Sequence, residues 1–530
     1  MNETPKTKSG WRILRRILIS LAILATLIAI FYTEEDWRGW HDWNQYKKKL
    51  GAQGVQLDFK AFIPKPVPAD QNFFMAPIFA GLSKEYYLDE KLHIGRRNTN
   101  VVDRLRMSIY GSGSSIEAPH IGYWVNGTTT DLEAWQQYYR ALAAKTGEFQ
   151  VPTQPGTPAA DVLLALSKHN STIEALRQAS RRPYSRLPLD YENRPAAATE
   201  MFPYLVDLKS CTQVLQLRAI AELQEGESQK AADDAKLILR LSDSLRTPPF
   251  LISYLVHIAT TSIALQSIYE GLAKHQWTDA QLMQLEQALA ESDFLKDCRF
   301  SLRSDEAGSL STIDYYRRHR LTFARLFYAF GYFGLQPTRG TWDKVMSICK
   351  MIGIYLMPNG WFYQNEVALV QAHRWDTKMV DTQHRLVSPE AIDKAGETDV
   401  AWRAKPWNFL ARESSLAISA TAAKTARVQV DVDLALTACA LERYRLAYGK
   451  YPRLLDALAP QFIKRVPHDI FGGKPLRYRR TADGIFVLYS IGWNEKDDGG
   501  VFAYPPGETS GTPVFRGLPH GDWVWRYPAK

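Results

Sequence analysis

The sequence contains few cysteines and lacks the motifs of several common enzyme classes. Its 530 residues include four cysteines, and none of them belongs to a C-x-x-C pair. Because a zinc site needs clustered ligands, we expect no zinc here. The phosphate loop G-x-x-x-x-G-K-[ST], the zinc motif H-E-x-x-H and the nucleophile elbow G-x-S-x-G are also missing. We expect the cysteines to be small buried thiols. The alternative is one disulfide, whose pairing is left open, among Cys211, Cys298, Cys349 and Cys439.

Charge of one sign is concentrated only at the N-terminus. Of the net charge of +9, +4 lies in residues 1–32, where Glu3 is accompanied by five basic residues: Lys6, Lys8, Arg12, Arg15 and Arg16. A nucleic-acid-binding protein is expected to gather basic and aromatic residues into one stripe, and no such block appears later in the chain. We therefore expect no nucleic-acid partner. With 45% apolar and 23% charged residues, the composition excludes a disordered chain and a polytopic membrane protein.

One long hydrophobic run is present, and it lies near the N-terminus. Residues 17–32 (ILISLAILATLIAIFY) carry no charge. Counted from Trp11, with the arginines snorkelling, the run would be roughly 33 Å long as a helix, which is enough to cross a hydrocarbon core of about 30 Å. The sequence therefore predicts a transmembrane helix over residues 11–32 that anchors the chain in a lipid bilayer.

The charges on either side of this run predict its orientation. Basic residues precede it and Glu34-Glu35-Asp36 follow it. By the positive-inside rule, residues 1–10 form a cytoplasmic tail and the rest of the chain lies in the periplasm, with the anchor in the bacterial inner membrane. A cleaved signal peptide is the alternative. An uncleaved anchor is favoured because the residues after the run, FYTEEDW, lack an A-x-A-like cleavage site.

The remainder of the chain is predicted to be mainly helical with a small α+β domain at the C-terminus. Residues 33–155 read as a mixed α/β membrane-proximal region that begins with its own helix, in which Trp37, Trp40 and Trp43 recur at helical spacing. Residues 156–410 read as a helical domain resembling an array of α-hairpins, with Gly226 at a turn. No consensus repeats at a fixed period, so an irregular helical domain is favoured over true repeats.

Three further features of the helical domain carry predictions. His257 lies within an apolar helix, and we interpret it as a core residue rather than a ligand or a base. Two apolar stretches, residues 326–335 and 345–357, are too short to span a membrane. Buried helices are the favoured interpretation of both stretches, and a membrane-surface contact beside the anchor is the alternative.

The C-terminal residues 411–530 have a distinct pattern. A long helix over 411–448 is predicted to end at Gly449. Two strands over 476–480 and 485–490 follow, with Ala482-Asp483-Gly484 as the hairpin turn. After them comes an oxygen-rich loop over residues 492–500.

Three motifs in this region, in this order, resemble the type II secretion major pseudopilin and its relatives. The family's A-x-x-x-Y-x-x-x-x-G-x-Y-P pattern matches residues 440–452, and its V-P-x-D turn, with the glycines and P-L-x-Y that follow, matches residues 466–478. Its Y-S-x-G strand end and acidic loop match residues 489–500. The resemblance covers about residues 430–527 and implies a long helix packed on an antiparallel sheet. It also implies that His468 and Asp469 belong to a structural turn. The chain as a whole resembles uncharacterised signal-anchored bacterial envelope proteins.

The same resemblance implies a calcium site. Carried over residue by residue, the ligands are Asn494, Asp497, Asp498 and Asp522. Calcium takes six to eight oxygen ligands, and this loop offers carboxylate, amide and carbonyl oxygens. A solvated turn without metal is the alternative. The N-terminus departs from the family, because Arg15 stands where pilin-type proteins carry a glutamate, so assembly into a fibre is not expected.

Two functions remain open at this point. The favoured one is a non-enzymatic, single-pass envelope protein whose helical part binds envelope partner proteins and whose pseudopilin-like domain serves docking or assembly. The alternative is a membrane-anchored hydrolase acting on envelope polymers. A Ser–His pair or converging carboxylates in a cleft would favour the hydrolase.

Overall fold

The structure is a computed structural model. It describes residues 8–80, 86–88, 94–96, 104–112, 115–188, 191, 203–320, 352–373, 379–395, 408, 410–411, 418–503 and 520–527. Residues 1–7 of the predicted tail, Cys349, the apolar stretch 326–335 and the first part of the stretch 345–357 lie outside these residues.

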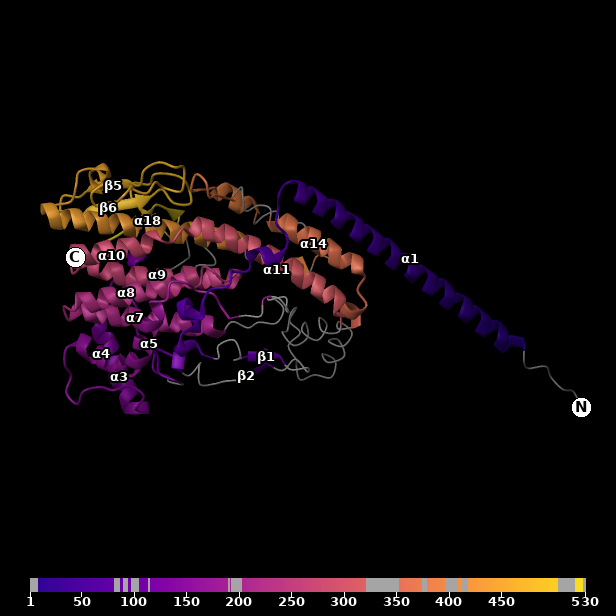
Figure 1. Ribbon diagram of the computed structural model, residues 1–530, viewed down its shortest axis with the longest axis horizontal. Coiled ribbons are helices and arrows are strands. Elements are labelled where there is room, and N and C mark those ends of the chain that lie inside the picture. Colours follow the sequence, from indigo (N-terminus) through magenta and orange to yellow (C-terminus); the bar gives the residue numbers. More distant parts are fainter. Residues whose placement is uncertain are drawn as a thin grey trace, which may run out of the picture. The chain divides into compact units, whose positions relative to one another are not determined.

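The chain folds into two compact units. Unit 1 comprises residues 1–58, 306–373 and 398–416, and unit 2 comprises residues 59–305, 374–397 and 417–530. Helices dominate, and a small sheet lies near the C-terminus of the chain, as the sequence predicted (Figure 1).

Unit 1 is organised around the helix α1 (Lys8–Ala52), which runs without a break through both predicted N-terminal helices. The helix α14 (Asn359–His373) packs along its second half. Gly39 and Gly360 allow this packing, because a side chain on either glycine would collide with the backbone of the opposite helix. Beyond the glycines an apolar core fills the interface, with Trp43 and Leu50 of α1 against residues that include Phe362 and Leu369 of α14.

The buried stripe of α1 excludes two of its tryptophans. Trp37 and Trp40 are exposed, whereas Glu35, Gly39 and Trp43 face α14. Tryptophan is the larger apolar residue, but only glycine permits the close approach of α14 at this level. The helical spacing of the aromatic residues correctly indicated a helix.

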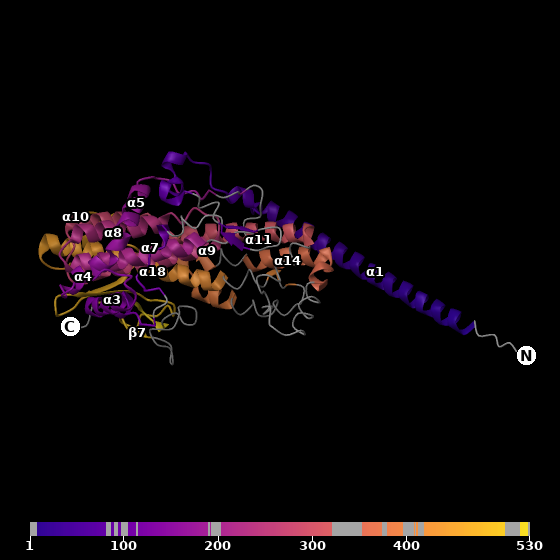
Figure 2. The ribbon, with the colours of Figure 1, turned by 90° about the horizontal axis from the view of Figure 1, so that it is seen from below.

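Unit 2 is built on a series of consecutive helices, of which the first three pack pairwise against one another and the fourth packs against the second. The helices are α7 (Pro203–Gln224), α8 (Ser228–Asp243), α9 (Leu251–Ala273), α10 (Asp279–Ala290) and the first part of α11 (Phe294–Arg318). The smaller helices α3 (Leu132–Thr146), α4 (Pro158–Leu166) and α5 (Asn170–Ser180) precede them. Contacts link α3 to α4, α4 to α7 and α5 to α8 (Figure 2). The predicted helical character of residues 200–300 is confirmed.

Local signals fix where these helices begin and end. Gly226 has a φ of +79° in the turn between α7 and α8, where a left-handed residue is needed. Thr278 caps α10 in a capping box with Gln281, and Asp131 caps α3 through a hydrogen bond from the Ala134 amide. The turn at Gly226 agrees with the sequence-based prediction.

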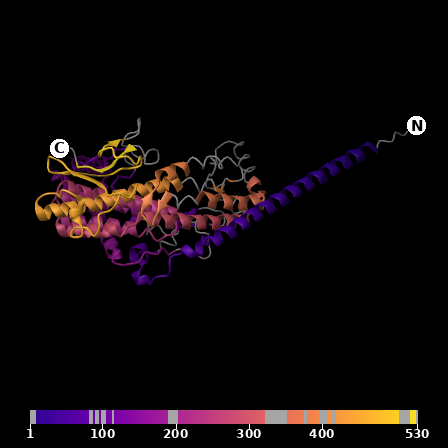
Figure 3. The ribbon, with the colours of Figure 1, turned by 90° about the horizontal axis from the view of Figure 1, so that it is seen from above.

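The C-terminal helix α18 (Ile418–Tyr448) packs against α9 and α10 within unit 2. A sheet of β5 (Arg477–Arg480), β6 (Phe486–Ser490) and β9 (Trp523–Trp525) lies on it in the order β5-β6-β9, all antiparallel (Figure 3). The predicted hairpin is confirmed, with Gly484 at a φ of +84°. Gly449 ends α18 as expected, at a φ of +70°.

Short elements complete the described chain. The remaining strand pairs are β1 (Tyr86–Leu88) with β2 (Ile94–Arg96), β3 (Val380–Asp381) with β4 (Leu386–Val387), and β7 (Phe502–Ala503) with β8 (His520–Gly521). Short 3₁₀ helices span Phe59–Phe62, Ala69–Gln71, Phe73–Met75, Pro77–Phe79, Trp124–Asn126, Ser167–His169 and Leu455–Leu458. Cys211, Cys298 and Cys439 are buried thiols in helices, the role expected of them.

Candidate functional site

The loop after β6 places the predicted calcium ligands on neighbouring turns. Asp497 accepts hydrogen bonds from the Tyr489 hydroxyl (2.9 Å) and the Gly499 amide (3.1 Å), and its second oxygen lies 3.2 Å from Arg477 Nε. Asn494 Nδ2 donates to Asp498 Oδ2 at 2.8 Å. Three of the four predicted ligands are therefore engaged with groups of the loop and of β5.

Asp522 is the most unusual of the four. It is fully buried between β8 and β9, where its Oδ2 accepts from the Gly500 amide at 2.6 Å and its Oδ1 has no hydrogen-bond partner. Burial and the negative charges of Asp498 and Asp497 raise its pKa. A cation would relieve this crowding of carboxylates, so the charge of the loop fits calcium. In the described part of the chain, however, no three His, Cys, Asp or Glu side chains converge as a metal-binding group.

His468 and Asp469 lie in a structural turn, as the resemblance implied. The buried Asp469 carboxylate accepts from the Phe471 amide, the Ser490 hydroxyl and the Ile491 amide at 2.8–3.0 Å. His468 Nε2 lies 3.2 Å from a backbone carbonyl oxygen. The aspartate thus joins the turn to the end of β6 and is already fully used as an acceptor.

A Ser–His–Asp arrangement does occur in the helical part of unit 2. Ser242 Oγ lies 2.8 Å from His257 Nδ1, and His257 Nε2 lies 3.8 Å from Asp297 Oδ2. The serine and histidine are buried, and the histidine ring stacks on Phe294 with 4.6 Å between centroids. Sequence reasoning missed this contact because α8, α9 and α11 bring the three residues together from distant parts of the chain.

The surroundings of these residues are those of a core network. The Ser242 hydroxyl donates to the His257 carbonyl and lies 2.8 Å from each of two threonine hydroxyls. Asp297 is held by Arg246 through two hydrogen bonds. Burial, reinforced by Arg246, lowers the pKa of His257 to about 3, which makes it a poor base at neutral pH. The prediction that His257 is a core residue is confirmed.

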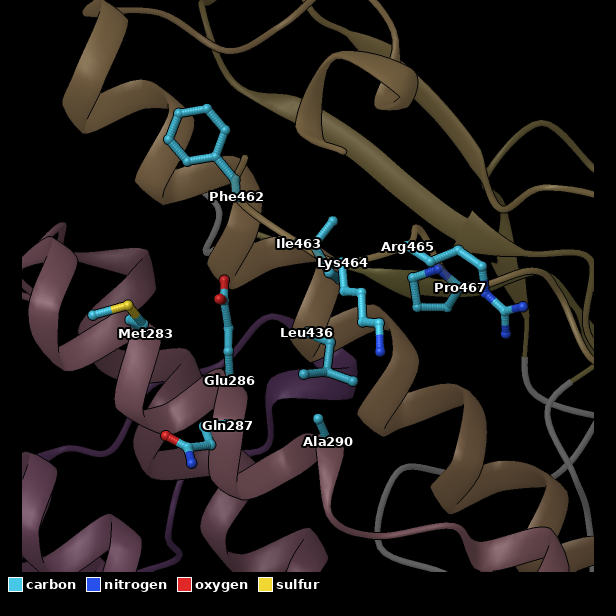
Figure 4. Close-up of a pocket in the computed structure, with 10 residues that line it drawn as sticks. All are labelled: Met283, Glu286, Gln287, Ala290, Leu436, Phe462, Ile463, Lys464, Arg465 and Pro467. Carbon is cyan, nitrogen blue, oxygen red and sulfur yellow. The ribbon is translucent and has the colours of Figure 1, made fainter. Parts of the chain in front are cut away.

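An open pocket of about 810 Å³ lies between α10, α18 and the segment that follows the 3₁₀ helix Leu455–Leu458. Its lining combines apolar side chains with a carboxylate, an amide and two cations (Figure 4): Met283, Glu286, Gln287, Ala290, Leu436, Phe462, Ile463, Lys464, Arg465 and Pro467. The size is typical of a pocket that holds a ligand or a peptide side chain.

Glu286 is the chemically distinctive residue of this pocket. Its Oε2 accepts from Arg443 Nη1 at 2.8 Å, and its buried Oε1 has no hydrogen-bond partner. Burial raises the pKa of Glu286 to about 7, against the opposing effect of Arg443. Glu286 therefore exchanges a proton near neutral pH, and its Oε1 is able to accept from or, when protonated, donate to a ligand.

The opposite wall of the pocket carries positive charge. Lys464 and Arg465 come from the segment after Phe462, and Figure 4 shows Lys464 and Glu286 projecting from opposite sides. Apolar side chains beside two cations suit a ligand that has both an apolar side chain and a carboxylate. No sequence pattern predicts this pocket, because its walls are separated by about 150 residues of chain.

No protein-family model, curated protein or solved structure matches this chain. The function must therefore be argued from the geometry described above.

Proposed function

We propose that this protein is a non-enzymatic, single-pass protein of the bacterial envelope that binds a partner protein, with the pseudopilin-like domain as part of the binding site. The anchor is α1, whose first half is long and apolar enough to cross a membrane. Its apolar side chains there are exposed on all sides, including Leu14, Leu18, Leu21, Leu24, Ile28 and Phe31. A helix that is apolar all round needs either a protein core or a lipid environment.

The proposed location is the inner membrane, with the N-terminus in the cytoplasm and the bulk of the chain in the periplasm. Its support is the charge asymmetry around residues 17–32. A second apolar helix, α9, also has the length of a span, but two thirds of its apolar window is buried within the fold, as in the core of a soluble domain.

The observation that carries the binding function is the pocket between α10 and α18. It joins the helical part of the unit to the pseudopilin-like segment, and its lining combines apolar side chains with the cations Lys464 and Arg465. We infer that it receives a segment of an envelope protein with an apolar side chain next to an acidic one. The hydrolase alternative gains no comparable support, since the Ser242 hydroxyl is buried and its hydrogen bonds are used inside the core.

Calcium is proposed as the ion of the loop after β6. Asp522 and Asp498 would hold it, with Asn494 and Asp497 as the other side-chain ligands. The support is the unpartnered Oδ1 of Asp522 and the carboxylates that crowd it. Bound calcium would supply charge neutralisation and fix the loop, without a part in chemistry.

Site-specific photocrosslinking tests the binding function. A photoreactive residue at Gln287, in the full-length protein in its native membranes, should crosslink one envelope protein. Ala290→Trp, which fills the pocket, should abolish that product. Ala280→Trp is the matched control, because Ala280 is exposed on the same helix and does not line the pocket. Equal crosslinking in both tryptophan variants would contradict the proposal.

A further inference from the structure

The segment just before α14 begins at the level where the apolar run of α1 ends. The Tyr32 hydroxyl, at the last residue of that run, donates a hydrogen bond to the Leu356 carbonyl. Both residues belong to unit 1. The contact therefore places residues 352–356 beside the end of the apolar run along the axis of α1.

The two segments advance in the same direction beyond this contact. The Gly360 amide donates to Asp36 Oδ1 at 2.8 Å, and Asn359 Nδ2 donates to the same carboxylate at 3.2 Å. Gly360, four residues after Leu356, therefore lies beside Asp36, which is four residues after Tyr32. Following the chain backward from Leu356 to Ile352 consequently leads toward the apolar half of α1.

The side chains of this segment are suited to lipid. Ile352, Tyr355 and Leu356 are spaced so that they share one helix face, and they are 49%, 53% and 54% exposed. The sequence analysis favoured burial here, and for these three residues that prediction is wrong. Two tryptophans of α1, Trp37 and Trp40, are 62% and 52% exposed and lie roughly 8 and 12 Å beyond Tyr32 along the helix. Exposed aromatic residues at this distance from a span are typical of the membrane–water interface.

Arg320 holds the segment in place. Its guanidinium donates to the carbonyls of Tyr355 and Met357 and to the side chain of Asn359, and it lies 4.5 Å from the centroid of the Phe362 ring. The backbone of the segment is therefore attached to the start of α14 on one side and to α1 on the other. The helix face that carries Ile352, Tyr355 and Leu356 therefore points away from both attachments.

We propose that residues 352–356 form a second membrane contact, inserting their apolar face into the interfacial zone of the bilayer beside α1. This inference rests on the proposed insertion of α1. The occupant is lipid, because the segment continues the apolar surface of the anchor at the height where the anchor leaves the hydrocarbon. Unit 1 would then rest on the membrane surface through this segment and the two exposed tryptophans.

Depth-dependent quenching tests the inference in the full-length protein in phosphatidylcholine nanodiscs. The fluorophore NBD is attached to Tyr355→Cys in a Cys349→Ser background, where the other three cysteines are buried. Lipids brominated near the ester group quench labels in the interfacial zone, and lipids brominated at the middle of the acyl chain, in separate nanodiscs, quench the label in the anchor. Matched labels are placed at Leu24→Cys in the anchor and at Lys48→Cys, which is exposed about 24 Å beyond Tyr32. Ile352→Cys gives a second site on the same face if labelling at position 355 disturbs the fold.

The expected result is a blue shift and loss of emission at positions 24, 352 and 355, and neither effect at position 48. Quenching at position 24 without quenching at 352 and 355 would overturn this inference and leave the anchor intact. A blue shift at 355 without bromine quenching would also overturn it, and would identify a second copy of the chain as the cover. Absence of quenching at 24 would instead refute the proposed anchor, and this inference with it.

Discussion

Arg443 of α18 donates to Glu286 of α10 through its Nη1 atom, at 2.8 Å, and the same atom donates to the Phe462 carbonyl at 2.8 Å. Its Nε donates to Asp279 at the start of α10. One guanidinium thus joins α18 to α10 and to the segment that forms the opposite wall of the pocket. Because of these contacts and the burial of α18, we expect the C-terminal region to fold as part of unit 2.

The buried carboxyl group of Glu286 predicts a pH-dependent stability. Its pKa is about 7 in the folded protein because of burial, against an ordinary value of 4.5. The folded state therefore holds a proton that the unfolded state has lost, so this contribution to stability is fully present below about pH 4.5 and is lost as the pH rises through 7. Thermal melts of the full chain should show that the difference in stability between Glu286→Gln and the parent changes between about pH 4.5 and 7 and is constant above pH 7. A difference that is the same at every pH would contradict this assignment.

Glu442 should behave in the opposite way. Although burial disfavours its charged form, hydrogen bonds from Arg445, His275 and Tyr451 lower its pKa to about 2. This carboxylate therefore stabilises the fold above about pH 4.5, by roughly 3 kcal/mol, and the contribution is lost as the pH falls toward 2. Urea unfolding of Glu442→Gln should show a deficit at pH 7 that shrinks in acid. A deficit that persists at the lowest pH would mean that packing, not charge, is responsible.

Ala232 tests the helix packing of unit 2. It is completely buried in α8, so Ala232→Asp places a carboxylate between helices and should destabilise the protein by roughly 3–5 kcal/mol. Ala280→Asp is the matched control, because Ala280 is exposed in the first turn of α10, where a negative charge is favourable. Melting temperatures of the two variants should differ widely. If they agree, Ala232 is not in the core.

Gly360 tests the contact between α1 and α14. A methyl group at this position collides with the backbone of Glu35, so Gly360→Ala should force the helices apart and destabilise unit 1 by at least about 2 kcal/mol. Gly353→Ala is the control, since nothing lies within 4 Å of a methyl group there. Limited proteolysis in detergent should cleave the first variant faster within α14 and leave the second unchanged. Equal cleavage of both would contradict the close approach of the helices.

Calcium should stabilise the full chain if the loop after β6 binds it. An ion that binds only the folded state adds about 2.7 kcal/mol at a hundredfold excess over its dissociation constant. Melts with calcium, with magnesium and with chelator should rank in that order of stability, since magnesium demands a tighter octahedron. Asp498→Asn combined with Asp497→Asn should remove the calcium effect. Identical melts in all three conditions would reduce the loop to a solvated turn.

Features with a local cause were predicted well. Gly226, Gly449 and Gly484 mark turns or a helix end through their own backbone freedom, and each holds the expected position. The apolar N-terminal run is likewise a property of consecutive residues. Such signals survive because tertiary contacts reinforce them instead of competing with them.

Features that depend on distant partners were not predictable. The close contact of Gly39 with Gly360 joins two residues that are more than 300 positions apart in the sequence. The pocket around Glu286 and the contact of Ser242 with His257 likewise need helices whose packing no short motif specifies. Neither glycine nor serine carries a pattern in the sequence that would identify its partner.

The unbroken course of α1 has a mechanical consequence. Since no residue between the apolar run and Gly39 departs from the helix, the side chains of the apolar run and the face that binds α14 have a fixed angular relation. Inserting one alanine after Thr33 would turn one half of the helix relative to the other by about 100° and lengthen it by about 1.5 Å. The unbroken helix would likewise transmit a rotation of the apolar run directly to the face that binds α14.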